Sequence, residues 1–383
     1  MTGFVLVATP AHADGPGSGT PYVVTVGDSY ISGEAGRWAG SSNDSETPAD
    51  ALGAHAYHDN ATHTAELIPK CHRSLSAEAY IGGGIGGLNL ACSGARVASS
   101  DGDTFKPGVD FYDNGAGHLG QAKMLQQFAA GHNVQQVVVS IGGNEFNFAA
   151  IVTQCVQDFL LSPSWFPDYC KDDSSVVSNF TSANVTAVRG RIATAFQNVR
   201  TAMRNAGYGD NAWTLVVQTY PSPIPAASGF RYGQSGYTRQ SVGGCGFWNA
   251  DADWANSTAL VTINNTVRAA IGQSGLTNAR LLELQSTFNG RRLCEKTVGL
   301  YEEVGLSSWT QPTAVDRTEW INQIRTVTTV GSDYYIQESL HPSYWGQLAL
   351  RSCVRQTYLQ SRGGTCTISG TGLLNGEPRV TLN

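Results

Sequence analysis

A serine with the features of a nucleophile follows the first apolar segment of the chain. The β-branched run 22–26 ends at Gly27, and Asp28 and Ser29 come directly after it. A sharp turn from a strand into a helix would expose the Ser29 hydroxyl beside the free N–H groups of the helix start. Such a hydroxyl is a weak nucleophile until a base removes its proton. The alternative is that Asp28 and Ser29 only cap a helix, since both residue types are favoured there.

A candidate base lies far along the chain at His341, which precedes Pro342. Proline suits the first position of a helix, so His341 would lie in the loop just before the last helix. Histidine is the best general base near neutral pH. Glu338, three residues earlier, could accept a hydrogen bond from the second ring nitrogen and fix the tautomer. An ordinary surface histidine is the alternative.

Two further segments could stabilise an oxyanion. Asn144 follows two glycines after the strongest apolar run, 134–141, so its amide could point into a crevice at the end of that strand. Gly94, after Ser93, could offer a free backbone N–H. Each has an ordinary alternative, because glycine turns with Asn or Ser are common in loops.

The elements needed to position these residues are visible in the hydrophobic pattern. Short apolar runs predict strands, and runs with a period near 3.6 predict helices. Strands are predicted at 22–26, 88–91, 134–141, 213–219 and 279–284. Helices are predicted from 29 to near 40, at 118–130, 183–206 and 251–271, and from Pro342 to about 359. This alternation predicts a parallel sheet covered on both faces, whose ligands bind beyond the carboxyl ends of the strands.

The four segments together resemble the SGNH hydrolases, also called GDSL esterases and lipases. The matching blocks are Gly-Asp-Ser-Tyr, Asn-Leu-Ala-Cys-Ser-Gly, Gly-Gly-Asn-Glu and Glu-Ser-Leu-His-Pro, within residues 21 to about 360. The resemblance implies an α/β three-layer α/β/α sandwich with a flavodoxin-like five-stranded parallel sheet. The chain is also similar to secreted actinobacterial members, which are rich in disulfides. It also implies that Ser29 and His341 are catalytic and that Ser29, Gly94 and Asn144 form the oxyanion hole.

This chain departs from the family pattern at two positions. Tyr30 replaces a leucine, and Glu338 stands where the family has an aspartate. Glutamate is longer by one methylene, and some members of the family use a backbone carbonyl in place of the acid. Both arrangements therefore remain open, with Glu338 as the expected third catalytic residue.

The cysteines and the first residues predict export. Residues 4–8 are apolar, and Ala11-His12-Ala13 fits a signal-peptidase site, so residues 1–13 are predicted to be the remnant of a signal peptide. A disordered tail is the alternative. The eight cysteines are even in number and form no Cys-x-x-Cys pair, which favours disulfides over zinc or free thiols. Although 105 pairings are possible, we expect neighbours to pair: Cys71–Cys92, Cys155–Cys170, Cys245–Cys294 and Cys353–Cys366.

Composition limits the partners. The chain of 383 residues carries a net charge of −6 and no basic run, which argues against nucleic-acid binding. No apolar stretch is long enough for a membrane span. We expect residues 14–383 to form a single domain, monomeric and secreted, with insertions near 41–70, 155–180, 221–250 and 286–335. No cofactor or metal is expected.

Two side-chain clusters have competing interpretations. His55, His58 and His63 lie close together and could bind a metal, but a solvated loop is favoured. Trp165, Phe166 and Tyr169, between two cysteines, could line an acyl pocket, but the small core of a stapled loop is favoured.

The sequence thus predicts an ester hydrolase that works through an acyl-enzyme, with a lipid or short-acyl ester favoured as substrate. The alternatives are a carbohydrate or feruloyl esterase, an acyltransferase that uses the same residues, and a carbohydrate-binding protein that kept the fold without catalysis.

Overall fold

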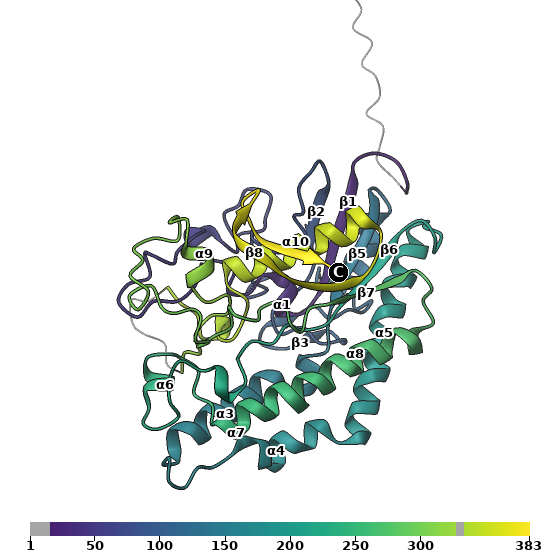
Figure 1. Cartoon of the computed structure of the whole chain (residues 1–383). Helices are drawn as coiled ribbons and strands as arrows, with labels where there is room; N and C mark the ends of the chain where they lie inside the picture. The colour runs from purple at the N-terminus through teal and green to yellow at the C-terminus, as the bar shows by residue number, and fades with distance from the viewer. Residues whose placement is uncertain (1–15, 327–332) are drawn as a thin grey trace, which may run out of the picture.

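The computed structural model describes residues 16–326 and 333–383 (Figure 1). The predicted signal-peptide remnant, residues 1–13, lies outside the described residues.

A mostly parallel sheet of seven strands forms the centre of the molecule, with the order β2-β1-β5-β6-β7-β8-β9. Its strands are β1 (Pro21–Gly27), β2 (Gly86–Asn89), β5 (Asn133–Ser140), β6 (Thr214–Gln218), β7 (Ala279–Glu283), β8 (Gly364–Leu374) and β9 (Glu377–Leu382). A separate antiparallel pair consists of β3 (Ser100–Asp101) and β4 (Phe105–Lys106). Each of the five predicted strands is present, with boundaries shifted by two residues or fewer.

The predicted count of five strands is wrong, because a C-terminal hairpin extends the sheet. β8 pairs in parallel with β7 through Leu282 and Glu283, and β9 runs antiparallel to β8. The hairpin turns at Asn375-Gly376, both with positive φ, and Asn-Gly is a strong signal for such a turn. This signal lies beyond residue 360, where the family resemblance ends.

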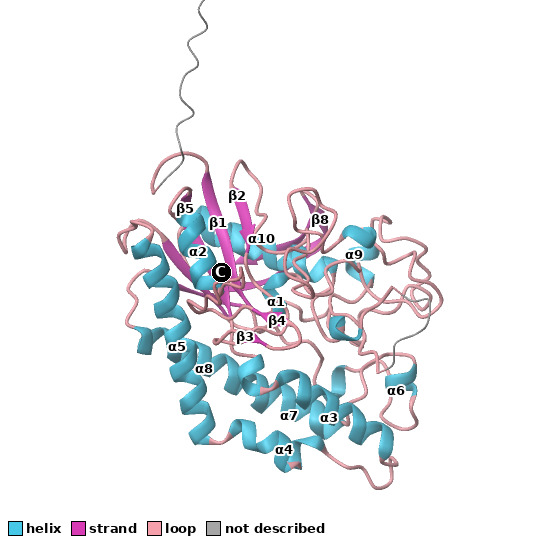
Figure 2. Cartoon of the chain, turned by 180° about the vertical axis from the view of Figure 1, so that it is seen from behind, coloured by secondary structure: helices cyan, strands magenta, loops and turns pink. Residues whose placement is uncertain are grey.

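Helices cover both faces of the sheet (Figures 1 and 2). Alternate strand residues point to opposite sides. Val23, Val138 and Val216 share a hydrophobic cluster with Trp345 and Leu348 of α10 (Tyr344–Gln360). Val24, Val137 and Val217 pack in the other cluster with α2 (Gln121–Ala129), α5 (Ser182–Asn205) and α8 (Leu260–Ser274). This two-sided burial explains why the strands read as continuous apolar runs.

The remaining helices are short, apart from α3 (Phe148–Leu161). The predicted helix after Ser29 is one turn only, α1 (Ser29–Ser32), because Gly33 ends it in the left-handed conformation. The other α-helices are α4 (Ser174–Val177), α6 (Thr238–Ser241), α7 (Asn249–Trp254) and α9 (Ala314–Arg317), and a π-helical turn at Ala255–Ala259 joins α7 to α8. Turns of 3₁₀-helix lie at Gly53–His55, Asn144–Phe146, Cys170–Asp172, Ser178–Phe180, Ala227–Gly229 and Ile336–Glu338.

The four disulfides are those expected from pairing between neighbours. Cys71–Cys92 anchors the segment before Ser93 and Gly94, and Cys155–Cys170 ties α3 to the loop that follows it. In the described ranges 16–326 and 333–383, no helix combines the length and apolar character of a membrane span.

Candidate active site

Ser29 lies at the carboxyl end of β1, one residue after a turn that requires glycine. Gly27 has φ +135°, and a Cβ there would lie 1.9 Å from the carbonyl oxygen of Ser140 on the neighbouring strand. Asp28 caps the single turn of α1 by accepting a hydrogen bond from the Tyr30 N–H at 3.2 Å. The capping interpretation is therefore correct for Asp28, and the tight turn presents the Ser29 side chain beyond the sheet edge.

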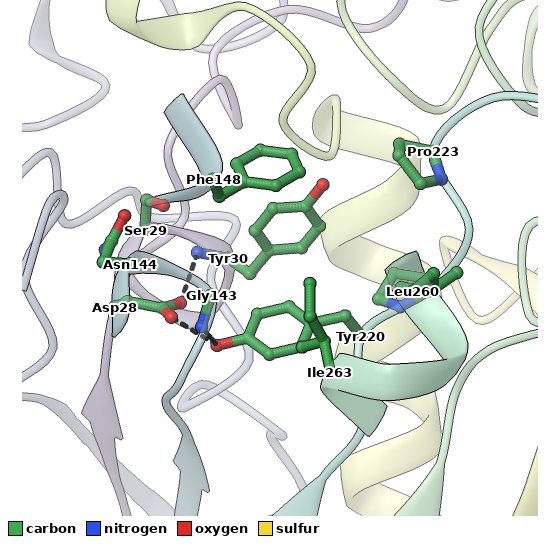
Figure 3. Close-up of a pocket in the computed structure, with 11 residues that line it drawn as sticks. Asp28, Ser29, Tyr30, Gly143, Asn144, Phe148, Tyr220, Pro223, Leu260 and Ile263 are labelled. Carbon is green, nitrogen blue, oxygen red and sulfur yellow. Dashed lines mark hydrogen bonds between the residues drawn. The ribbon is translucent and has the colours of Figure 1, made fainter. Parts of the chain in front are cut away.

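A buried hydrogen-bond chain connects three strand ends below Ser29 (Figure 3). The N–H of Gly143 donates to the Tyr220 hydroxyl at 2.9 Å, and that hydroxyl donates to the carboxylate of Asp28. Burial raises the pKa of Asp28 to about 7, although the Tyr220 hydrogen bond opposes this shift. No sequence motif predicts a role for Tyr220. The available signal is its position just after β6, because ligands are expected beyond the carboxyl ends of the strands.

The structure brings the predicted nucleophile and base together. The Ser29 Oγ lies 2.7 Å from Nε2 of His341, although 312 residues separate them in the sequence. The other ring nitrogen, Nδ1, lies 2.9 Å from the carbonyl oxygen of Ser339. Because a carbonyl can only accept, Nδ1 carries the proton, and Nε2 is free to accept the proton of Ser29. Burial lowers the pKa of His341, which keeps this neutral form populated near neutral pH.

The loop that holds His341 is fixed from two sides. Leu340 has φ +60°, which is strained for a leucine. Its carbonyl accepts a hydrogen bond from the Tyr30 hydroxyl at 2.9 Å, and its N–H donates to the carbonyl of Asn322 at 3.1 Å. Tyr30, the departure from the family pattern, therefore ties the turn that carries Ser29 to the loop that carries His341.

Glu338 does not occupy the position expected of a third catalytic residue. Its buried carboxylate accepts hydrogen bonds from the Tyr57 hydroxyl, from Trp38 Nε1 at 2.8 Å and from the Tyr335 N–H at 2.9 Å. Burial raises its pKa to about 7. The Ser339 carbonyl takes the place at Nδ1, since the backbone turn brings it closer to the ring than the Glu338 side chain.

Gly94 and Asn144 line the same cavity as Ser29 and His341. Gly94 has φ +80°, and none of the hydrogen bonds within the described residues uses its N–H. One N–H of the Asn144 amide donates to the carbonyl of Ala95 at 2.9 Å, which leaves the other hydrogen of the amide for a ligand. The predicted oxyanion donors are thus assembled around Ser29.

A second histidine, His72, lies buried nearby, and no sequence motif predicts a role for it. His72 Nδ1 lies 2.8 Å from Glu34, and Nε2 lies 3.4 Å from Glu66. Burial opposes a charge on His72, but these carboxylates prevail and raise its pKa. Burial would raise the pKa of Glu34, but the charge of His72 and its hydrogen bond outweigh burial, so the pKa of Glu34 is lowered. Glu34 also raises the pKa of His341 through its charge, against the larger effect of burial.

Three cavities adjoin Ser29 or its neighbours. An outer cavity of about 540 Å³ is lined by Ser29, Gly94, Asn144 and His341, by one face of α3, and by the cations Lys106 and Arg325. An inner cavity of about 30 Å³ begins at Ser29 and passes between Tyr30, Tyr220 and Ile263 (Figure 3). A third cavity of about 70 Å³ lies beside the inner cavity and extends to the half-buried Trp254.

The other clusters have no part in this site. Trp165 and Phe166 are 83% and 74% exposed, so they form neither an acyl pocket nor a loop core. His55 and His58 contact each other at the surface, while Asp59 pairs with Arg73. Within the described ranges, no group of three or more His, Cys, Asp or Glu is arranged to hold a metal ion.

Comparisons with known proteins give only distant matches. No protein-family model matches the chain, and no curated protein matches it. Among solved structures, an extracellular lipase from Streptomyces rimosus is 18% identical, with a TM-score of 0.43 over 89% of this chain and 99% of that one. A phospholipase A1 from Streptomyces albidoflavus is 16% identical, with a TM-score of 0.43 over 90% and 100%. A carbohydrate acetylesterase from Sinorhizobium meliloti is 11% identical, with a TM-score of 0.29 over 69% and 84%. Matches of this strength leave the activity to be argued from the geometry of the site.

Proposed function

We propose that this protein is a secreted serine hydrolase that cleaves carboxylic esters through an acyl-enzyme. The observation that carries the proposal is the 2.7 Å contact between Ser29 Oγ and Nε2 of His341. A serine within hydrogen-bond reach of an oriented, neutral imidazole is an activated nucleophile.

In the proposed reaction, His341 takes the proton from Ser29 as the hydroxyl attacks the ester carbonyl. The Ser339 carbonyl holds Nδ1–H and stabilises the imidazolium that forms. The N–H groups of Ser29 and Gly94 and the amide of Asn144 hold the oxyanion. His341 then protonates the leaving alcohol, and a water molecule repeats the cycle to release the acid.

The favoured substrate is a lipid or short-acyl ester. Apolar side chains of α3, Phe148, Val152 and Val156, line the outer cavity, and the inner cavities are also mainly apolar. The four disulfides support the proposal of an extracellular protein, because disulfides persist in oxidising compartments.

Replacing the nucleophile tests the proposal. We expect Ser29→Ala to lower kcat for p-nitrophenyl esters by about 10⁴-fold or more and to abolish labelling by a fluorophosphonate probe. Melting temperatures of both proteins would confirm that the variant is folded. A folded Ser29→Ala protein with wild-type activity would refute the assignment.

The oxyanion assignment has a separate test. We expect Asn144→Ala to lower kcat by about 10²–10³-fold with little change in KM, because the donor acts on charge that develops in the transition state. An unchanged kcat would remove Asn144 from the site.

A further inference from the structure

The cavities on the two sides of Ser29 differ in which catalytic groups they reach. His341 lines the outer cavity and is absent from the lining of both inner cavities. In the proposed reaction His341 must protonate the leaving alcohol, and water must later attack from the same side. The alcohol part of the ester therefore has to lie in the outer cavity.

The acyl chain must then extend from the carbonyl carbon in the opposite direction, toward the side of Ser29 where the inner cavities begin. The cavity of about 30 Å³ is lined by Ser29 and Asn144 at one end. It shares four lining residues with the cavity of about 70 Å³: Phe148, Pro223, Leu260 and Ile263. The two spaces are thus neighbouring compartments of one path that starts at the nucleophile.

The chemistry of this path suits an aliphatic chain. Among the described residues that line it, Asp28 is the only one with an acidic or basic side chain, and its carboxylate is engaged by Tyr30 and Tyr220. Cavities with mainly apolar walls accept apolar ligands. At the far end of the path, Ala255 and Ala259 belong to the π-helical turn between α7 and α8, and Trp254 precedes this turn. Such turns are frequent at functional sites.

Phe148 separates the path from the outer cavity. It is the one residue that lines all three cavities among those described, and its ring lies beside Ser29 and Tyr30 (Figure 3). The preceding residue, Asn147, has φ +58°, and Arg96 and Asn179 hold its side chain. Phe148 therefore starts α3 from a fixed backbone, while its ring forms the partition.

We propose that the two inner cavities bind the aliphatic chain of the acyl group, with Phe148 as the wall that separates this chain from the leaving alcohol. This inference rests on the proposed function. The proposed substrates are esters of extended aliphatic acids, whose acyl chains would reach beyond Ile263 toward Ala259.

Two matched Ala→Leu variants test the proposal, because Ala259 lines only the inner path and Ala149 lines only the outer cavity. The quantity measured is the kcat/KM of p-nitrophenyl octanoate divided by that of p-nitrophenyl acetate. We expect Ala259→Leu to lower this ratio about tenfold or more, since filling an apolar pocket penalises the longer chain selectively. Ala149→Leu should leave the ratio at the wild-type value.

An enlarging variant makes the test independent of overpacking. Ile263→Ala widens the junction of the two inner cavities. We expect it to raise the kcat/KM of p-nitrophenyl esters with chains longer than octanoyl, relative to the kcat/KM of p-nitrophenyl acetate. The proposal is overturned if neither inner variant changes the ratio, or if Ala149→Leu is the variant that lowers it. The proposed function has a separate test: the wild type should hydrolyse p-nitrophenyl acetate and Ser29→Ala should not, whatever the octanoate-to-acetate ratio is. The serine hydrolase function and the acyl-chain path can therefore be refuted independently.

Discussion

Two histidines near Ser29 have opposite surroundings. His72 lies against the carboxylates of Glu34 and Glu66, and its pKa is raised. His341 lies between the Ser29 hydroxyl and the Ser339 carbonyl, and burial lowers its pKa. Contact with carboxylates favours the charged form of a histidine, whereas a neutral carbonyl orients the ring and leaves it a base. Proximity to an acid is therefore a poor guide to which histidine is catalytic.

The strongest test of this comparison replaces each histidine in turn by glutamine. We expect His341→Gln to lower kcat by about 10⁴-fold or more, because no other side chain contacts Ser29 as a base within the described residues. His72→Gln should retain most of the activity and lose about 1–3 kcal/mol of stability, since Glu34 loses its charged partner. Kinetics with p-nitrophenyl esters and urea unfolding measure the two effects. Comparable losses of activity in both variants would refute the distinction between His341 as the base and His72 as a structural residue.

The second prediction concerns the carboxylate that the sequence assigned to His341. We expect Glu338→Gln to keep kcat/KM within about tenfold of the wild type, because the Ser339 carbonyl, not Glu338, contacts Nδ1. An amide can still accept from Trp38 and Tyr335 while donating to the Tyr57 oxygen. A fall of about 10⁴-fold, as expected for loss of an orienting acid, would restore Glu338 to the catalytic group.

A smaller effect is expected on the pH dependence of stability. The folded pKa of His72 is raised, so its contribution is present below about pH 6.5 and is lost as pH rises through the raised value. Glu338 also has a raised pKa, about 7 against 4.5, so its burial favours the protonated form and stability falls between these values. The free energy of unfolding should be measured by urea at each pH and plotted against pH. We expect its slope to become flatter above pH 6.5 in His72→Gln and below pH 7 in Glu338→Gln. An unaltered slope in either variant would contradict the corresponding shift.

The smallest predicted effect is on the pH–rate profile. The kcat/KM of the wild type should rise with pH and level off, with a midpoint below the ordinary histidine value of about 6.5. Removing the negative charge in Glu34→Gln should lower the midpoint further by less than about one unit. An upward shift in Glu34→Gln would mean that Glu34 does not act on His341 through its charge.

The hydrophobic pattern predicts some elements of the fold correctly and does not predict others. The strand ends at Gly27 and Ile141 were predictable, because a run buried on both faces has a plain signature and glycine marks its end. Helix α3 was missed, because its segment was taken for part of a loop stapled by Cys155 and Cys170. The C-terminal hairpin was missed although Asn375-Gly376 signals its turn.

The order of residues along the chain is enough to establish which residue types stand at the strand ends and which cysteines are near enough to pair. Both properties are local, since they depend on short-range hydrophobic pattern and spacing. The sequence could not show that Ser29 meets His341, that the Ser339 carbonyl and not Glu338 contacts the imidazole, or that Phe148 lies between the inner and outer cavities. These contacts join segments far apart in the sequence, so they exist only once the folded chain has packed these segments together.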